Sequence, residues 1–330
     1  MATPAEMAEI WRGDFRESLH LGHAVICGPG GEIVESWGDP DMEVLPRSSA
    51  KMIQALPLLE SGAARVAGLS QQQLALACAS HKGAAIHVDP VRNWLRDLGL
   101  GADDLRCGAH MPTDRDEANR IIRAHAAPCQ CHNNCSGKHA GFLTLNRHLG
   151  AGPDYVAPEH PVQVAVKSAF EEVTGQVSPG FGIDGCSAPN FATTLHGMAR
   201  AMAFFAGASG GTARSDAAVA LREAMMAWPE LVAGEGRACT ELMRACGGKV
   251  ALKTGAEGFF VAIIPERKLG VALKIVDGGT RGADCAIASI LVKLGLVAAD
   301  HPAVLKFRNA PMLNCRGIEA AHIRPGAAFA

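Results

Sequence analysis

Residues 253–276, with the sequence KTGAEGFFVAIIPERKLGVALKIV, decide how this chain is expected to fold. The apolar runs 259–264 and 270–276 flank a short charged turn, which is typical of two antiparallel strands joined as a hairpin. A lysine, a threonine and a glycine come shortly before the first of these strands. The sequence therefore predicts a late hairpin with Lys253 near its entrance.

A second hairpin is predicted near the start of the chain, over residues 19–38. Apolar and polar residues alternate on both sides of the glycine-rich turn 28–31, and such turns favour tight hairpins. The region between the two hairpins is rich in Ala, Leu, Met and Arg and has helical spacing. Helices are expected over residues 52–59, 89–98, 115–124, 162–173, 214–227 and 285–296.

Two terminal hairpins around a helical middle predict an α+β fold, in which one antiparallel sheet is built from both chain ends. We expect the strands to come from about residues 19–47 and 249–330, and the helices and loops from about residues 48–248. The chain shows no internal repeat or linker, so a single catalytic domain is predicted over residues 1–330.

Composition excludes several classes of function. The 330 residues are 48% hydrophobic and 19% charged, and the net charge of -2 offers no excess of positive charge for nucleic acid or membranes. The N-terminal segment lacks a basic stretch followed by an apolar run, so a cytoplasmic location is predicted. The longest apolar runs are too short to span a bilayer. In a reducing compartment, the eleven cysteines indicate thiols or metal ligands rather than disulfides.

The first candidate for chemistry is Ser48 with Lys51, at the start of a predicted helix. Side chains three residues apart share one face of a helix, so Lys51 could take the hydroxyl proton of Ser48 if its amine is desolvated. The alternative is a structural one, in which Ser48 caps the helix and Lys51 is solvated. Spacing alone leaves both interpretations open.

Two further segments carry candidate catalytic residues. A Ser-x-x-Lys at an early helix start and a Lys-Thr-Gly on a late strand, here Lys253 to Gly255, are the pair named for serine β-lactamases and penicillin-binding proteins. Ser80, in the segment Ser80-His81-Lys82, follows an apolar run at a point where a buried segment meets a glycine turn. A helix cap is the alternative role of Ser80, and a solvated strand-end charge is that of Lys253.

Three thiols and two imidazoles lie within residues 129–139, CQCHNNCSGKH. Thiolate and imidazole are preferred zinc ligands, although the spacing is not that of a zinc finger. The turn that contains Asp184 and Cys186 could supply another thiol. The alternative is that both segments are turns with incidental cysteines.

Five motifs taken together are similar to those of the asparaginase II family, the Rhizobium etli type of L-asparaginase. The motifs are RSSAK (47–51), CASH (78–81), NCSGKH (134–139), DGC (184–186) and VAGEGR (232–237). The resemblance runs in order from about residue 23 to residue 275. It implies a homodimer that hydrolyses L-asparagine to L-aspartate and ammonia, on a fold similar to serine β-lactamases and glutaminases.

The resemblance also implies roles for particular residues. It pairs Ser48 with Lys51 and Ser80 with Lys253 as two catalytic tandems, without deciding which serine attacks. It implies a zinc site at Cys135, Lys138 and Cys186, with Asp184 close by, and substrate contacts at Arg47 and His139. Cys129 and Cys131 are additional thiols of this chain.

Other functions remain open at this point. A penicillin-recognising serine hydrolase shares the two lysine motifs, and a glutaminase would need room for only one more methylene group. A protein that is not an enzyme could use the cysteine cluster for zinc binding or redox sensing.

Overall fold

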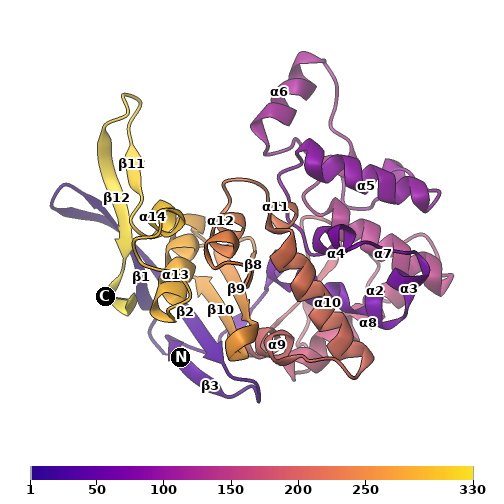
Figure 1. The fold of residues 1–330 in the computed structure, drawn as a ribbon, viewed down its shortest axis with the longest axis horizontal. Helices are drawn as coiled ribbons and strands as arrows, with labels where there is room; N and C mark the ends of the chain where they lie inside the picture. Colours follow the sequence, from indigo (N-terminus) through magenta and orange to yellow (C-terminus); the bar gives the residue numbers. More distant parts are fainter. Residues whose placement is uncertain (1, 330) are drawn as a thin grey trace. The chain divides into compact units, whose positions relative to one another are not determined.

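One antiparallel sheet takes its strands from both ends of the chain, as the two predicted hairpins indicate. The computed structural model describes residues 2–329, and in it seven strands follow the order β11-β12-β1-β2-β10-β9-β8, while β3 pairs with β2. Figure 1 shows indigo strands from the start of the chain beside orange strands from near its end. The predicted α+β class is confirmed.

The strands of the described chain and their bounds are as follows: β1 Ala5–Arg12, β2 Phe15–Cys27, β3 Ile33–Trp37, β4 Glu43–Val44, β5 Phe181–Ile183, β6 Pro189–Phe191, β7 Thr193–Thr194, β8 Ala251–Thr254, β9 Phe259–Ile264, β10 Leu269–Ile275, β11 Pro311–Leu313 and β12 Glu319–Pro325. The α-helices are α1 Lys51–Gln54, α2 Leu56–Glu60, α3 Ala63–Val66, α4 Gln71–Ala77, α5 Ala85–Asp97, α6 Arg115–Arg123, α7 Ser136–Leu149, α8 Pro161–Thr174, α9 Leu195–Gly207, α10 Ala213–Ala227, α11 Pro229–Val232, α12 Ala238–Ala245, α13 Thr280–Lys293 and α14 Pro302–Arg308.

Strands β9 and β10 form the predicted late hairpin. Ala272 on β10 pairs with Val261 on β9 and, on its other side, with Val25 on β2. Every residue of β9 is buried. A strand that is covered on both faces reads as a continuous apolar run, which is why this segment is so easily recognised in the sequence.

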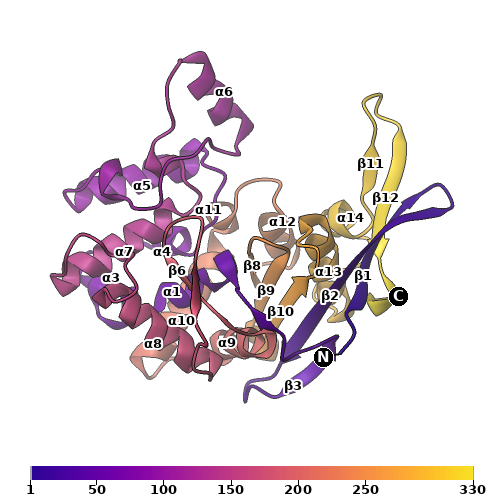
Figure 2. The ribbon, with the colours of Figure 1, turned by 180° about the vertical axis from the view of Figure 1, so that it is seen from behind.

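Helix α9 packs closely against the sheet at Gly270. A Cβ atom at this position would lie 2.0 Å from the backbone nitrogen of Ala203 and 2.3 Å from the carbonyl oxygen of Ala199. Glycine is therefore required where the helix and β10 approach each other. Helix α13 contacts β1, β9 and β10, and Figure 2 shows these strands from behind.

The described residues group into two compact units, each built from segments that are distant in sequence. The sheet unit contains residues 2–49, 193–207 and 238–329, and the helical unit contains residues 50–192 and 208–237. The prediction of one catalytic domain over residues 1–330 stays a prediction.

Most of the predicted helices are present, with two differences in detail. Helices α5, α6, α8, α10 and α13 lie where helical spacing indicates. The segment 52–59 is two short helices, α1 and α2, because Pro57 in the first turn of α2 cannot donate a backbone hydrogen bond to a continuing helix. The sheet also begins earlier than residue 19, with β1.

The sequence did not indicate β1 because its polar residues have partners far along the chain. Glu9 accepts hydrogen bonds from Trp11 Nε1 at 2.6 Å and from Arg324 Nε at 3.0 Å. The guanidinium of Arg324 also lies 3.8 Å from the centre of a Trp11 ring. These contacts make a charged residue compatible with a largely buried position in the sheet.

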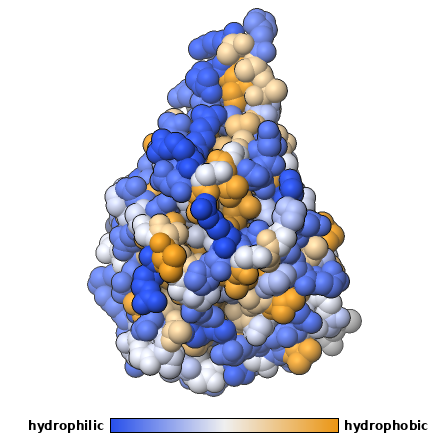
Figure 3. Space-filling model, turned by 90° about the vertical axis from the view of Figure 1, so that its right-hand side faces the viewer, coloured by the Kyte–Doolittle hydropathy of each residue, from blue (hydrophilic) through white to orange (hydrophobic). Residues whose placement is uncertain are grey.

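The surface shown in Figure 3 is mainly hydrophilic, with small separate hydrophobic patches. None of the helices within residues 2–329 is both long enough and apolar enough to cross a membrane.

Candidate active site

The helical unit brings Lys51 and Ser80 together in its interior. Lys51 is the first residue of α1, and Ser80 lies three residues beyond the end of α4. The Lys51 Nζ atom is 2.9 Å from Ser80 Oγ, and Lys51 is fully buried. The backbone nitrogen of Ser80 donates to the carbonyl oxygen of Val232 at 2.8 Å, which fixes the position of the serine.

The amine of Lys51 has three acceptors around it. Besides Ser80, it donates to the carbonyl oxygen of Ala79 and to the sulfur of Cys135, the latter at 3.1 Å. An ammonium group has three protons, so each acceptor can receive one. A neutral amine could keep two of these bonds and turn its lone pair toward Ser80 Oγ. The same geometry thus suits a base that receives a proton from Ser80.

The N-terminal end of α7 carries the predicted zinc ligands Cys135 and Lys138. Asn133 Oδ1 accepts a hydrogen bond from the backbone nitrogen of Cys135 at 2.8 Å, and Asn134 Oδ1 lies 3.0 Å from the Cys135 sulfur. Lys138 is one turn further along, and its Nζ is 3.0 Å from the sulfur of Cys186.

Cys186 and Lys138 form a buried pair of opposite charges. A hydrogen bond from the Cys135 thiol lowers the pKa of Cys186 far below its ordinary value, against the effect of burial, and the charge of Lys138 adds to this. The same hydrogen bond raises the pKa of Cys135. Burial alone would lower the pKa of Lys138, but the charge of Cys186 raises it well above its usual range. Lys138 and Cys186 therefore each favour the charged form of the other.

Asp184 lies in the same turn as Cys186, between β5 and β6. Its backbone is held by hydrogen bonds to Ala188 and Ser187, and Ser187 has a φ of 71°, in the left-handed region. Asp184 Oδ2 is 3.8 Å from the Cys186 sulfur. The place of Asp184 beside a metal stays a prediction.

His139 follows Lys138 on α7 and is held by Tyr155. The backbone nitrogen of Arg106 donates to Tyr155 Oη at 2.7 Å, which leaves the hydroxyl proton to bond His139 Nδ1 at 2.9 Å. The other ring nitrogen of His139 is buried, and the imidazole interacts with the side chain of Cys186. Burial lowers the pKa of His139 to about 4, against the effect of Cys186. His139 is thus a buried imidazole beside the Cys186 thiol.

The side chains around Cys186 fit a zinc ion in their chemistry. Two sulfurs and one amine meet within hydrogen-bond distance, and sulfur and nitrogen are the donors that zinc prefers. Residues 2–329 contain no cluster of three His, Cys, Asp or Glu side chains that could hold a metal, so the lysine amine would be needed as a ligand. The ammonium of Lys138 occupies the place of a cation beside the thiolate.

The sheet unit brings the segment of Ser48 against the Lys253 strand. Ser48 is half-buried in the short 3-10 helix η1, Arg47–Ala50, and its neighbour Ser49 donates through Oγ to the carbonyl oxygen of Lys253 at 3.1 Å. Lys253 is fully buried on β8, and its Nζ donates to the carbonyl oxygen of Thr254 at 2.7 Å. Lys253 and Thr254 are therefore the last two residues of a late strand, and Gly255 follows it directly.

Arg47 begins η1 with a backbone in the left-handed region, at a φ of 53°. Arg47 is half-buried. A non-glycine residue in this conformation is strained, and such strain is often found at functional sites.

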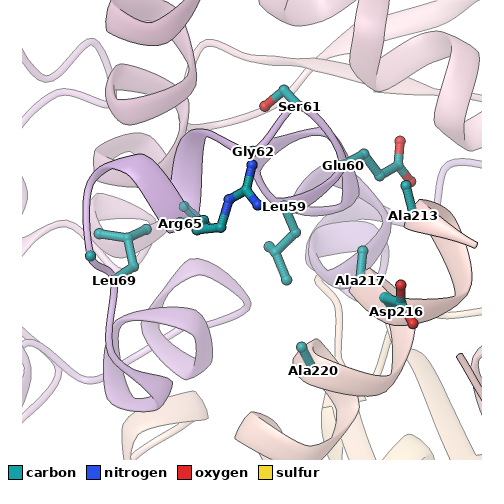
Figure 4. A pocket seen from close by; sticks show the side chains of 12 residues that line it. Leu59, Glu60, Ser61, Gly62, Arg65, Leu69, Ala213, Asp216, Ala217 and Ala220 are labelled. Atoms are coloured by element: carbon teal, nitrogen blue, oxygen red, sulfur yellow. The ribbon is translucent and has the colours of Figure 1, made fainter.

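A separate pocket in the helical unit contains none of the predicted site residues. It has a volume of about 710 Å³ and lies between α2, α3 and α10. Figure 4 shows Arg65 on one side of this pocket and the carboxylates of Glu60 and Asp216 on the other. The candidate active site is thus distinct from this pocket.

Three contacts of the site could not be recognised from sequence motifs. These are the bond from Tyr155 to His139, the bond from Ser49 to Lys253 and the contact of Lys51 with Cys135. Tyr155 is the single tyrosine of the chain, and this rarity was the only feature of the sequence that could have drawn attention to it.

Residues 8–325 match the family described as L-asparaginase II. The chain belongs to this family. Membership of the L-asparaginase II family supports amidohydrolase activity, and it confirms the resemblance that the five motifs indicate. No curated protein matches the chain.

Similar solved structures include Mglu and β-lactamases. Mglu in its tris and glutamate form is 14% identical over 90% of this chain and 64% of that chain, with a TM-score of 0.48. A class C β-lactamase from Rhodobacter sphaeroides is 15% identical over 84% of this chain and 95% of that chain, with a TM-score of 0.44. A β-lactamase from Mycobacterium bovis is 12% identical over 84% of this chain and 95% of that chain, with a TM-score of 0.36. The chain covers less than two thirds of the length of Mglu.

Proposed function

We propose that this protein is an L-asparaginase, which hydrolyses L-asparagine to L-aspartate and ammonia through an acyl-enzyme. The proposal rests on family membership and on the buried contact of 2.9 Å between Lys51 Nζ and Ser80 Oγ. An amide is a weak electrophile, so the reaction needs an activated nucleophile and an acid for the departing ammonia. A serine paired with a buried lysine can supply both.

The proposed reaction has two stages. The lysine amine takes the serine proton, the serine oxygen attacks the side-chain carbonyl, and the lysine returns the proton to the nitrogen as the C–N bond breaks. Ammonia leaves and a β-aspartyl ester remains. Water then loses a proton to the lysine and attacks the ester, and the serine regains a proton as the C–O bond breaks. Arg47 would pair with the α-carboxylate, and His139 would contact the substrate.

Two tandems could supply these groups. In one arrangement Ser48 attacks with Lys51 as its base, and Ser80 with Lys253 relays protons. In the other, Ser80 is the nucleophile. The contact between Lys51 and Ser80 supports a shared role for Lys51, which is also three residues from Ser48 in the sequence.

Single-turnover acylation by asparagine tests the scheme. We expect Ser48→Ala, Ser80→Ala and Lys51→Met each to lower turnover by about 10²-fold or more, as for loss of a nucleophile or general base. The serine variant that forms no ester identifies the nucleophile. Lys167→Met is the control, because Lys167 is an exposed residue of α8 that pairs only with Glu171 among its described contacts. Full activity in both serine variants would refute the scheme.

Substrate specificity is tested by measuring hydrolysis of three compounds side by side. We expect ammonia release from asparagine to exceed that from glutamine, and no turnover of nitrocefin. Preferential release from glutamine would identify a glutaminase instead. Nitrocefin turnover without ammonia release from asparagine would identify a penicillin-recognising hydrolase.

We also propose that Cys135, Lys138 and Cys186 hold zinc, with Asp184 beside them. When bound, zinc would supply a Lewis acid that orients and polarises the amide. We expect metal analysis to find about one zinc per chain, and Cys186→Ser to lose it, since a thiolate is the strongest ligand of the set. Chelation that raises mainly KM would indicate positioning, and a fall in kcat would indicate a part in chemistry. A protein purified without zinc that also fails to bind added zinc would contradict the proposal.

Family resemblance further supports a homodimer. Sedimentation equilibrium should give twice the chain mass of 34.4 kDa.

A further inference from the structure

A second group of reactive side chains lies outside the proposed catalytic scheme. Cys131 and His132 belong to the short 3-10 helix η3, Gln130–His132, in the helical unit, and Cys129 directly precedes it. The sequence singles out this cysteine cluster, yet the proposed reaction uses neither Cys129 nor Cys131. Arg92 on α5 and Glu117 on α6 lie next to these residues and bear on the reactivity of the thiols.

Cys129, His132 and Glu117 form a chain of nucleophile, base and carboxylate. The sulfur of Cys129 is 3.3 Å from His132 Nδ1, and His132 Nε2 is 3.2 Å from Glu117 Oε1. His132 Nδ1 accepts a hydrogen bond from the backbone nitrogen of Cys129 at 3.0 Å and also lies 3.2 Å from the carbonyl oxygen of Cys129. In the tautomer whose proton lies on Nε2, that proton bonds to the Glu117 carboxylate, and the Nδ1 lone pair is shared between the backbone nitrogen and the thiol of Cys129. In this tautomer His132 can take a proton from the Cys129 thiol.

The surrounding charges favour the ion pair that this transfer forms. A hydrogen bond from Arg120 lowers the pKa of Glu117, and a hydrogen bond from His132 lowers it further. The Glu117 carboxylate that bonds to the His132 imidazole is therefore ionised. On the other side, Arg92 Nη2 is 3.7 Å from the Cys129 sulfur. A thiolate is stabilised by such a guanidinium and by an imidazolium. Cys129 is also half-buried rather than buried, so small reagents can reach it.

Cys131 is placed to react with Cys129 in a second step. Its side chain is only 1% exposed, and it is hydrogen-bonded to the side chain of Cys129. Burial raises the pKa of Cys131 to about 12. The two thiols therefore differ: one is accessible and next to a base, and the other is shielded and protonated.

We propose that Cys129 is a peroxide-reactive thiol and that Cys131 is its resolving thiol. The Cys129 sulfur attacks one oxygen of a hydroperoxide, the O–O bond breaks, and Cys129 becomes a sulfenic acid while the peroxide leaves as water or an alcohol. The Cys131 thiol then attacks the Cys129 sulfur, the S–O bond breaks, and water leaves with the thiol proton. Both thiols are oxidised to one disulfide and one hydroperoxide is reduced.

The position of the pair connects it to the candidate active site. The carbonyl oxygen of Cys131 accepts a hydrogen bond from Ser136 Oγ at 3.0 Å, and Ser136 Oγ is 2.9 Å from His81 Nε2. Ser136 follows Cys135, and His81 follows Ser80. A disulfide between residues 129 and 131 would thus change the conformation of the segment whose carbonyl oxygen binds Ser136. Through Ser136 and His81, this segment is hydrogen-bonded to the residues that follow Cys135 and Ser80. This effect on turnover rests on the proposed function, whereas the thiol chemistry does not.

The chain contains a matched control for thiol reactivity. Cys315 is exposed, and no imidazole, carboxylate or guanidinium has a described bond to its sulfur. Reduced protein is treated with limiting hydrogen peroxide or iodoacetamide at pH 7, and each cysteine is followed by peptide mass spectrometry. We expect Cys129 to react at least about tenfold faster than Cys315, because His132 is placed to take the Cys129 thiol proton and Arg92 lies beside the sulfur. Equal rates at the two cysteines would overturn the proposal.

Variants separate the two steps. With peroxide, the wild type should lose two hydrogens as a disulfide between residues 129 and 131, whereas Cys131→Ser should accumulate a sulfenic acid that dimedone traps. A stable dimedone adduct in the wild type would disprove the resolving role. His132→Gln should reduce the rate at Cys129 to about that of Cys315. If this variant fails to fold, Arg92→Gln, at an exposed position on α5, should still slow the reaction severalfold, and an unchanged rate in Arg92→Gln would count against the proposal.

Discussion

Gly255 shows how a single residue holds two parts of the site together. A Cβ atom at this position would lie 2.7 Å from the carbonyl oxygen of Pro46 and 2.9 Å from Ser49 Oγ. The glycine of the Lys-Thr-Gly sequence therefore lets β8 approach the backbone that leads into Ser48. The first of these atoms belongs to the backbone, so a side-chain rotation cannot relieve the clash.

Gly255→Ala should accordingly destabilise the protein by about 1–3 kcal/mol, the usual cost of overpacking, and should lower kcat by displacing the segment 46–49. Urea unfolding and asparagine turnover measure the two effects. Gly101→Ala is the control, because no atom lies within 4 Å of its added Cβ, and it should change stability by less than about 0.5 kcal/mol. If both alanine variants have equal stability, the close approach has no energetic importance.

The residues of the site could be predicted better than their partners. Motif spacing identified Lys51, Ser80 and Cys135 as candidates, because each residue type has its own chemistry. The contact of Lys51 with both Ser80 and Cys135 joins positions 29 and 84 residues apart, and nothing local in the sequence specifies such a contact. His139 was likewise recognised from its motif, whereas its bond to Tyr155 depends on how α7 packs.

Two histidines on neighbouring elements give the helical unit a specific sensitivity to acid. His81 follows α4 and His87 lies on α5, and their rings stack with centroids 4.8 Å apart. Burial lowers the pKa of His81 well below its ordinary value of 6.5, and the charge of His87 lowers it further. Burial also lowers the pKa of His87, although less. The other charges facing the pair are Lys51, His110 and His132 around His81, and Asp114 and Lys82 around His87.

Below pH 6.5 the unfolded chain therefore binds more protons at these histidines than the folded protein does. Stability should fall as the pH drops through this range, with each histidine contributing up to about 1.4 kcal/mol per pH unit. Urea unfolding at pH 7.5, 6.5 and 5.5 measures the slope. His87→Gln should make the slope shallower by up to one proton. An unchanged slope in this variant would show that the pair does not control acid stability.

Whether an element could be predicted depended on where its partners lie. The hairpin of β9 and β10 was predicted because its turn and its apolar residues are adjacent in sequence. Strand β1 was not, because Glu9 finds Arg324 only when the end of the chain pairs beside it. The segment 52–59 forms two helices because of Pro57. This residue is visible in the sequence, but the helical spacing of the apolar residues around it indicated one continuous helix.

At the scale of the whole molecule, the two ends of the chain complete one sheet. Ile10 on β1 is the direct partner of Ile323 on β12, and both belong to a buried cluster with Ala8, Cys285 and Ala321. Ile10 is 1% exposed and Ile323 is 4% exposed. The core of the sheet unit is therefore closed by residues more than 300 positions apart, and loss of either should weaken the attachment of the other.

Ile10→Ala and Ile323→Ala should each cost about 2–5 kcal/mol, as for buried isoleucines. Because the two side chains occupy paired positions, the double variant should cost less than the sum by about 0.5 kcal/mol or more. Urea unfolding of the four proteins gives this coupling energy. Ile318→Ala is the matched control, since Ile318 is 49% exposed in the same C-terminal segment and should change stability by less than about 0.5 kcal/mol. If the effects of the two buried substitutions are strictly additive, β1 and β12 stabilise the sheet independently. The pairing of these two strands would then make no cooperative contribution to the stability of the sheet.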